Sequence, residues 1–534
     1  MSQHDRIVRT RFGQVRGLPL AGRYEGITVF RGIPYAAPPV GALRFRPPAD
    51  PPAWSGVRDC DTDPPIAMQD CHLAPTYEPQ CSDFYWRGMP MCSEDCLYLN
   101  IATGSIPERH EAPLQPVLLW FHDGLSGGYA YEPEFDPAEL AHRGVVVVSV
   151  GHRLHLFGYL LLSQFANEQR SAGGNYGLMD QFKALDWVCD NIAGFGGDPD
   201  NITVGGQGGG AEKSAALATS PKARGRVRRL INQSGLFWLR WFREPDIAER
   251  DSHRHLMSIG IDPDLSPDAL RALSARDLLG PTERMVAFHP SMVWDGEYIA
   301  YQEQARNFAA YGGDLDVMAG SNLGEVPMSP DGPLFPEPFS DIRDYQAYMR
   351  RLLRGLYDKY DFPRIFPVTQ TNMNHQIRLL DAYGLTGTDG LMTRRHFGAY
   401  RAATGASGKT FVYLFSHRPP GPGDTDNRRD PDRLLSWRGS ELWFTFGSLR
   451  PGVPPARHWR HRDYRLAEQL TGYWANFIHT GDPNGPGLPA WPVCGAQYGW
   501  MHLGEQPAGH IGLRDELEAL ILEKLLSDPS IPRA

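Results

Sequence analysis

The chain is 534 residues long, with a formal net charge of −9, 41% hydrophobic residues and a mean hydropathy of −0.40. This acidic balance excludes a basic surface that attracts nucleic acid or anionic lipid, so neither is expected as a partner. No apolar run approaches the roughly 20 residues that a membrane-spanning helix needs, and the N-terminus shows no apolar core of a signal peptide. We therefore expect a cytoplasmic, core-forming protein of one large unit or of a few domains.

The first half of the chain contains buried strands in alternation with a helix. Residues 117–121 and 145–150 are continuous apolar runs, which are typical of strands buried on both faces of a parallel sheet. Residues 180–192 place apolar side chains on one helical face. A further strand, ending near Ile202 and Val204, runs through glycines into a helix-forming segment. This order predicts a doubly wound α/β fold, with a mostly parallel twisted sheet flanked by helices.

The second half of the chain is more helical and irregular. Residues 240–400 are interrupted by one buried strand at 317–320 and are expected to hold cap or lid insertions. Residues 411–415 indicate a late strand and residues 516–526 a closing helix. Because there is no internal repeat and no low-complexity tract, a single domain spanning 1–534 is favoured over several domains.

A glycine cluster, Gly206-Gln207-Gly208-Gly209-Gly210, stands between the strand at 202–204 and the following helix. This strand–turn–helix context is that of a nucleophile elbow, G-x-S-x-G, in which a strained turn presents a serine. Both flanking glycines are present, but the central position is Gly208. The alternative is an ordinary glycine turn, or a loop that cradles a phosphate.

Seven cysteines are present, and five of them fall between residues 60 and 96. Their spacing matches no zinc pattern, so no metal site is predicted. Because no secretion signal is visible, we expect a reducing compartment and free thiols.

Six further motifs occur in order along the chain. They are Gly32-Ile-Pro-Tyr-Ala, Ser93-Glu-Asp-Cys-Leu-Tyr-Leu-Asn100, Gly174-Asn-Tyr-Gly-Leu-Met-Asp-Gln181, Ala193-Gly-Phe-Gly-Gly-Asp-Pro-Asp-Asn-Ile-Thr203, Gln233-Ser-Gly235 and Thr480-Gly-Asp-Pro-Asn484. Together these motifs resemble the type-B carboxylesterase family of the α/β-hydrolase fold, the group that includes the cholinesterases. The similarity runs from about Val8 to Trp491, nearly the whole chain.

The resemblance implies a Ser–Glu–His triad and an oxyanion hole of backbone amides, and this chain departs from both. The nucleophile position is Gly208, and the base has become Arg438, which cannot accept a proton. The acidic member maps to Glu325, so the carboxylate survives. We predict that Arg438 and Glu325 form a buried ion pair; the alternative is that Arg438 turns to solvent.

The oxyanion loop also departs from the family pattern H-G-G-G-F. It reads His122-Asp123-Gly124-Leu125-Ser126 in this chain. The amides of Gly124 and Gly209 could still point into the pocket, which Leu125 and Gln207 are expected to border. His122 is expected to be structural, and Asp123 to be either functional or a turn cap.

Three more positions lie near the elbow in the sequence pattern. His155 stands where the family has a glycine. Glu212 is expected on the same helical face as Gly208, with Lys213 pointing away. Both Glu212 and Lys213 are expected to be structural.

Four functional interpretations follow from these departures. The favoured one is a repurposed non-hydrolytic enzyme, a cyclase, isomerase or lyase, that binds a small hydrophobic molecule in the gorge and needs no cofactor. Only six lysines occur among the basic residues, a bias typical of GC-rich bacterial genomes. Bacterial natural-product biosynthesis is the setting expected for such an enzyme. The others are a non-catalytic interaction protein, a ligand-sequestering relic, and a hydrolase with a relocated nucleophile such as Ser126 or Ser214. A monomer or a homodimer is expected.

Overall fold

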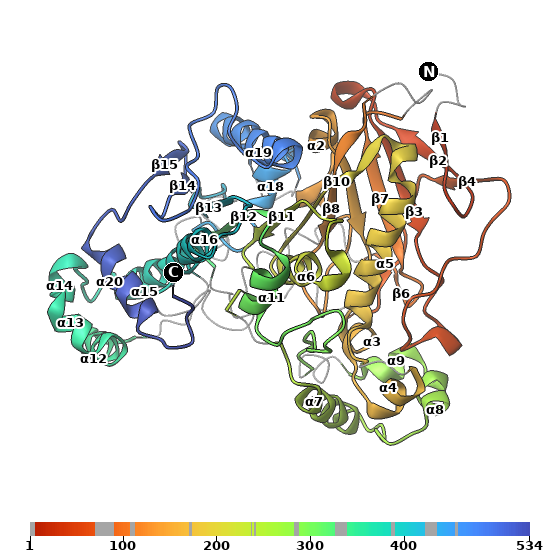
Figure 1. Ribbon diagram of the computed structural model, residues 1–534, viewed down its shortest axis with the longest axis horizontal. Coiled ribbons are helices and arrows are strands. Elements are labelled where there is room, and N and C mark those ends of the chain that lie inside the picture. The colour runs from red at the N-terminus through yellow and green to blue at the C-terminus, as the bar shows by residue number, and fades with distance from the viewer. Residues whose placement is uncertain are drawn as a thin grey trace.

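The computed structural model describes residues 6–69, 90–106, 113–169, 173–235, 238–239, 242–281, 288–325, 339–385, 390–421, 435–453 and 458–533. Within these ranges, thirteen strands form one sheet in the order β1-β2-β3-β7-β9-β8-β10-β11-β12-β13-β14-β15, with β4 beside β2, and β5 pairs with β6 (Figure 1). The strands are β1 (Ile7–Arg9), β2 (Gln14–Pro19), β3 (Thr28–Pro34), β4 (Val57–Cys60), β5 (Ile66–Ala67), β6 (Cys92–Ser93), β7 (Tyr98–Thr103), β8 (Gln115–Phe121), β9 (Val146–Val150), β10 (Gly197–Gln207), β11 (Arg229–Gln233), β12 (Asp316–Asn322), β13 (Thr410–Phe415), β14 (Trp500–Leu503) and β15 (Ala508–His510).

The centre of the sheet is parallel and its edges are antiparallel. Every neighbouring pair from β9 through β8, β10, β11, β12 and β13 to β14 is parallel. The pairs β1–β2, β2–β3, β3–β7 and β7–β9 at one edge and β14–β15 at the other are antiparallel. The predicted α/β fold with a mostly parallel sheet is confirmed, and β8 and β9 are the apolar runs on which the prediction rested.

The helices are α2 (Ala138–His142), α3 (His155–Tyr159), α4 (Ser163–Gln169), α5 (Tyr176–Asn191), α6 (Gly209–Ala218), α7 (Pro245–Ser258), α8 (Pro267–Ala272), α9 (Ala275–Leu279), α11 (Gln304–Tyr311), α12 (Ile342–Leu353), α13 (Gly355–Lys359), α14 (Phe362–Ile365), α15 (Met373–Tyr383), α16 (Leu391–Ala403), α18 (Leu442–Thr445), α19 (His461–Thr480) and α20 (Glu516–Leu526). Helices α12, α13 and α14 gather at one end of the molecule, far from the parallel strands (Figure 1). None of the helices in the described ranges is long and apolar enough to cross a membrane.

Two cores cover the opposite faces of the sheet. Because side chains alternate along a strand, Leu119 of β8 enters the core that contains Phe182 and Leu185 of α5, whereas Trp120 enters the core that contains Trp474 of α19. The helix predicted at 180–192 is confirmed, although it begins earlier, at Tyr176, and ends at Asn191.

The expectation of free thiols is wrong at one cysteine. Cys92 is disulfide-bonded, whereas Cys60, Cys96, Cys189 and Cys494 are free. The other two cysteines of the sequence, at 71 and 81, lie outside the described residues. The expectation rested on a reducing compartment, and a disulfide is typical of an oxidising one.

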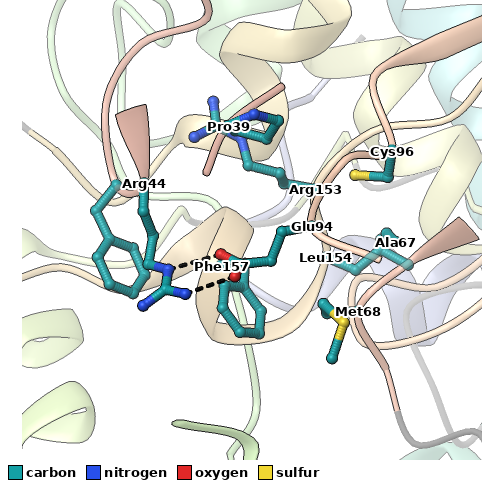
Figure 2. Close-up of a pocket in the computed structure, with 10 residues that line it drawn as sticks. Pro39, Arg44, Ala67, Met68, Glu94, Cys96, Arg153, Leu154 and Phe157 are labelled. Atoms are coloured by element: carbon teal, nitrogen blue, oxygen red, sulfur yellow. Dashed lines mark hydrogen bonds and ion pairs between the residues drawn. The ribbon is translucent and has the colours of Figure 1, made fainter. Parts of the chain in front are cut away.

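A buried ion pair holds the turn that follows β9. The backbone amide, Nε and Nη2 of Arg153 donate to the Asp180 carboxylate of α5 at 3.0, 2.8 and 2.6 Å. Arg153 lies beside a second buried pair, in which Arg44 Nε and Nη2 donate to Glu94 (Figure 2). The side chains of Arg153 and Asp180 are 3% and 0% exposed, so neither charge can be hydrated if the other is lost.

We expect Asp180→Asn to destabilise the protein by about 3–5 kcal/mol, because it leaves the Arg153 guanidinium buried without its counter-charge. Urea denaturation measures the free energy of unfolding. The matched control is Asp50→Asn, which removes a carboxylate that is 48% exposed and pairs with Lys183; a surface pair of this kind contributes at most about 1 kcal/mol. Equal effects of the two substitutions would contradict the assignment.

Candidate active site at the turn between β10 and α6

The turn after β10 has the geometry of a nucleophile elbow. Gly208 has φ 56° and ψ −120°, and α6 begins at the next residue. Its amide donates to the Gln233 carbonyl at 2.8 Å. A Cβ atom on Gly210 would lie 2.1 Å from the Phe121 carbonyl oxygen, so this flanking position accepts only glycine. The predicted strand–turn–helix arrangement is therefore present, with a central residue at positive φ, a conformation that favours glycine.

The carboxylate of Asp123 fills the space in front of this turn. Its Oδ1 accepts hydrogen bonds from the amides of Gly124 and Gly209, both at 2.5 Å. A Cβ atom added to Gly208 would lie 2.2 Å from the same oxygen. The two amides that were expected to face the pocket thus already hold a carboxylate of the chain itself. We call this arrangement the amide cradle.

Lys213 lies beneath the amide cradle, and the expectation that it points away is wrong. Its Nζ donates to the Gly124 carbonyl at 2.7 Å and lies 2.8 Å from Nε2 of His152. Because α6 begins at Gly209, Lys213 is four residues into the helix and shares a face with Gly209, not with the turn before it. Burial lowers the pKa of Lys213 to about 7, while Asp123 and Glu212 act in the opposite direction.

Two histidines pack against each other under the same loop. The rings of His122 and His152 stack with centroids 4.4 Å apart. Nδ1 of His122 lies 2.8 Å from the Asp123 carbonyl oxygen, and Nδ1 of His152 lies 3.2 Å from the Val150 carbonyl oxygen. A carbonyl only accepts, so both rings carry their proton on Nδ1. Burial and the nearby Lys213 hold the pKa of each ring well below its usual range, so both rings are neutral. This geometry fits the structural role expected for His122.

Arg438 and Glu325 form an ion pair. Nη1 of Arg438 lies 3.3 Å from Oε2 of Glu325, whose Oε1 accepts from the Asn322 amide at 2.7 Å. The two side chains are 31% and 20% exposed, so the pair is half-buried rather than buried as expected. Arg438 keeps its charge in this setting because guanidinium does not deprotonate in proteins.

A second glutamate behind this pair was not among the predicted site residues. Glu441 is fully buried, and its Oε2 and Oε1 accept from Nδ2 of Asn322 at 2.5 Å and Nε2 of Gln233 at 3.2 Å. Burial, followed by repulsion from Glu325, raises the pKa of Glu441 to about 7. Its place three residues after Arg438 was the signal available in the sequence.

Comparisons with known proteins show the family of this chain. Residues 4–519 match the model of the carboxylesterase family. The chain belongs to the carboxylesterase family. A liver carboxylesterase of Sus scrofa is 30% identical, covering 93% of this chain and 89% of its own, and the cocaine esterase of Homo sapiens is 30% identical, covering 93% and 88%. Among solved structures, a PNB esterase superposes with a TM-score of 0.74 at 25% identity over 97% and 99% of the two chains. A Geobacillus stearothermophilus carboxylesterase superposes with a TM-score of 0.73 at 27% identity over 96% and 99%.

The two serines named as relocated nucleophiles lie in different settings within this carboxylesterase-family site. Ser214 is buried in α6, and its hydroxyl donates to the Gly210 carbonyl at 2.8 Å. Ser126 is exposed on the loop that follows β8. A nucleophilic serine needs a base within hydrogen-bond reach, whereas the hydroxyl of Ser214 donates to a carbonyl oxygen.

The remaining predicted residues frame the site. Gln207 is 1% exposed at the end of β10. Leu125 is half-buried, and its carbonyl accepts from the amide of His155 at 2.7 Å. His155 has φ 51°, a conformation that glycine adopts more easily than other residues. This conformation accounts for the glycine that the family has at this position. Glu212 is buried in α6, as expected for a structural residue.

We expect Gly208→Ser to destabilise the protein by about 1–3 kcal/mol, because the new side chain overlaps Oδ1 of Asp123. In an Asp123→Gly background the same change should cost much less, since the carboxylate is gone. A double-mutant cycle on the free energy of unfolding measures this coupling. Additive effects of the two substitutions would contradict the steric overlap.

Glu441 makes stability depend on pH in a defined direction. The pKa of Glu441 in the folded protein, about 7, lies above the ordinary value of 4.5. Its favourable contribution to the free energy of unfolding is therefore complete below pH 4.5 and is lost as pH rises through 7. Relative to Glu441→Gln, the wild type should lose up to about 3 kcal/mol across this window. Urea denaturation at several pH values measures the difference. The exposed Glu516→Gln is the control, and parallel stability curves for wild type and Glu441→Gln would refute the assignment.

Proposed function

We propose that this chain is a carboxylesterase-family protein that has lost the Ser–His–Glu triad and catalyses a non-hydrolytic reaction on a small hydrophobic molecule. Isomerisation, cyclisation and elimination are the reaction types that suit it. The observation that carries this proposal is the carboxylate of Asp123 in the amide cradle, where acyl transfer needs the oxygen of its substrate.

Three requirements of serine hydrolysis fail together at this site. The elbow position is Gly208, which has no hydroxyl to attack an acyl carbon. Arg438, beside Glu325, cannot take a proton as a general base. Asp123 occupies the amides of Gly124 and Gly209, so these two donors are not available to a tetrahedral oxyanion. Loss of a single oxyanion donor costs about 10²–10³ in rate.

The same geometry supplies a different reactive group. Asp123 is half-buried and is held by two backbone amides. A carboxylate so fixed can remove a proton from a bound molecule and return it elsewhere, as isomerisation, cyclisation and elimination require. Positioning by the pocket contributes the rest of the acceleration. The second candidate function is ligand binding without catalysis. In that case Asp123 would still occupy the amide cradle but would transfer no proton.

We expect the purified protein neither to hydrolyse p-nitrophenyl esters above background nor to react with a fluorophosphonate probe. Without a triad, acceleration over water is limited to about 10³–10⁴-fold. The matched variant is Gly208→Ser combined with Asp123→Gly and Arg438→His, which restores a hydroxyl, an empty cradle and an imidazole beside Glu325; it should react with the probe. Robust labelling of the wild type would refute the proposal.

Substitution of Asp123 distinguishes a catalytic protein from one that only binds its ligand. A small molecule that stabilises the wild type in a thermal-shift screen should be converted by it, with conversion followed by mass spectrometry and NMR. Asp123→Asn should retain the thermal shift and lose the conversion. Binding without conversion by the wild type, across the molecules that bind, would favour the ligand-binding candidate.

A further inference from the structure

Two buried histidines pack against each other between helices α3 and α7. The rings of His155, in α3, and His255, in α7, have centroids 5.7 Å apart, and Phe288 contacts these rings at 5.1 and 4.8 Å. The two histidines are 2% and 4% exposed. We call these three residues the histidine cluster. The proton transfer proposed for Asp123 does not use it.

His255 is buried without a hydrogen-bond partner. Neither of its ring nitrogens is bonded to any of the residues that the structure describes. The next residue, Leu256, belongs to an apolar core with Leu156 and Phe157 of α3. An imidazolium is stable where it has a counter-charge, hydrogen bonds or water, so a proton on this ring would be costly to keep buried. The ring is therefore neutral while α7 is packed.

Helix α7 has a small buried face. It lies at the periphery of the molecule (Figure 1), and of its 14 residues four are buried, namely Ala248, Ser252, His255 and Leu256. Oγ of Ser252 accepts from the amide of Leu161, which follows α3, at 3.1 Å. A helix with so few buried side chains loses a large share of its packing when one of them becomes charged.

His155 connects the histidine cluster to the loop that carries Asp123. Its amide donates to the Leu125 carbonyl, two residues after Asp123, at 2.7 Å. Its backbone has φ 51°, a conformation that costs free energy in residues other than glycine and persists where the surroundings enforce it. The packing of its ring against His255 and Phe288 contributes to that enforcement.

We propose that protonation of His255 releases α7 from α3 and, through His155, loosens the loop that holds Asp123 in the amide cradle. When α7 leaves, the ring of His155 loses its neighbour, its backbone relaxes from the strained conformation, and its amide no longer holds Leu125. As a statement about how the site is regulated, the inference rests on the proposed function, in which Asp123 is the reactive group. Mild acid therefore disables the site.

The direction of the pH dependence follows from the burial of His255. The titratable groups on the elements around it are His155 and Tyr159 of α3, Glu249 and Asp251 of α7, Asp277 of α9 and His289 after Phe288. Burial, rather than any of these groups, lowers the pKa of His255 from 6.5 to about 4. Because the released helix takes up a proton more readily than the packed one, the packing of α7 is complete above pH 6.5 and weakens as pH falls toward 4.

Hydrogen–deuterium exchange of the full-length protein, read by mass spectrometry at pH 8 and pH 5 and corrected for the intrinsic exchange rate, measures the release. The two pKa values predict a rise of about 30-fold in the opening of α7 between these conditions. Exchange in the loop at 122–128 should rise with it. Exchange in β8 and β9 should stay constant, which separates local release from acid unfolding of the whole protein.

Three variants test the role of each histidine. His255→Phe keeps an aromatic ring but cannot take a proton, so the opening of α7 should no longer depend on pH. The matched control is His253→Gln on the same helix, where the side chain is 34% exposed, and it should keep the rise. His155→Gly adopts positive φ without strain, so it should keep the release of α7 and abolish the response of the loop.

A constant exchange of α7 between pH 8 and pH 5 in the wild type would overturn the inference. An undiminished rise in His255→Phe, or a released α7 beside an unaffected loop, would overturn it as well. If His255→Phe does not fold, NMR of the wild type with labelled histidine decides, because a titration of His255 near its ordinary pKa of 6.5 contradicts its burial as a neutral ring.

The ester and fluorophosphonate assays test the proposed function by a separate readout. Constant exchange with both assays negative removes the inference and leaves the proposed function. Fluorophosphonate labelling of the wild type refutes the proposed function, while the release of α7 is still decided by exchange.

Discussion

The two hydrogen bonds from the amides of Gly124 and Gly209 to Asp123 are the interaction on which the rest of the site depends. The amide of Gly209 lies in the first turn of α6, where backbone amides have no acceptor within the helix. In an acyl-transfer enzyme that acceptor is the substrate, so the amides stay available between turnovers. Here a side chain of the chain itself supplies the acceptor permanently. Because the acceptor belongs to the chain and not to the substrate, these two amides are not available to bind a substrate oxygen.

Buried polar groups around the loop hold the Asp123 carboxylate in place. Lys213 anchors the loop from below, neutral His122 and His152 pack beside it, and the Arg153–Asp180 pair fixes the turn from which His152 projects. Each of these groups is buried, and each would be costly to bury without its partner. The loop that carries Asp123 is therefore supported by polar contacts as well as by apolar packing.

Much of the fold was predictable from the sequence, because buried parallel strands leave continuous apolar runs, as at 117–121 and 145–150. The elbow was predictable from its glycines, and the contact between Arg438 and Glu325 from their places in the family pattern. The direction of the Lys213 side chain was not predictable, because it depends on which residue starts α6. A shift of one position rotates a helical side chain by about 100° around the helix axis. The orientation of Asp123 was not predictable either, since a free loop allows several rotamers.

The filled cradle also constrains the routes by which this protein could change. A serine returning at position 208 would meet the Asp123 carboxylate, and a glycine at position 123 alone would leave two amides with no acceptor and no hydroxyl beside them. Each of these single substitutions therefore removes a contact of the present site without completing a serine triad. A return to a triad needs a serine at position 208, a glycine at position 123 and a histidine at position 438 together, on three separate segments of the chain.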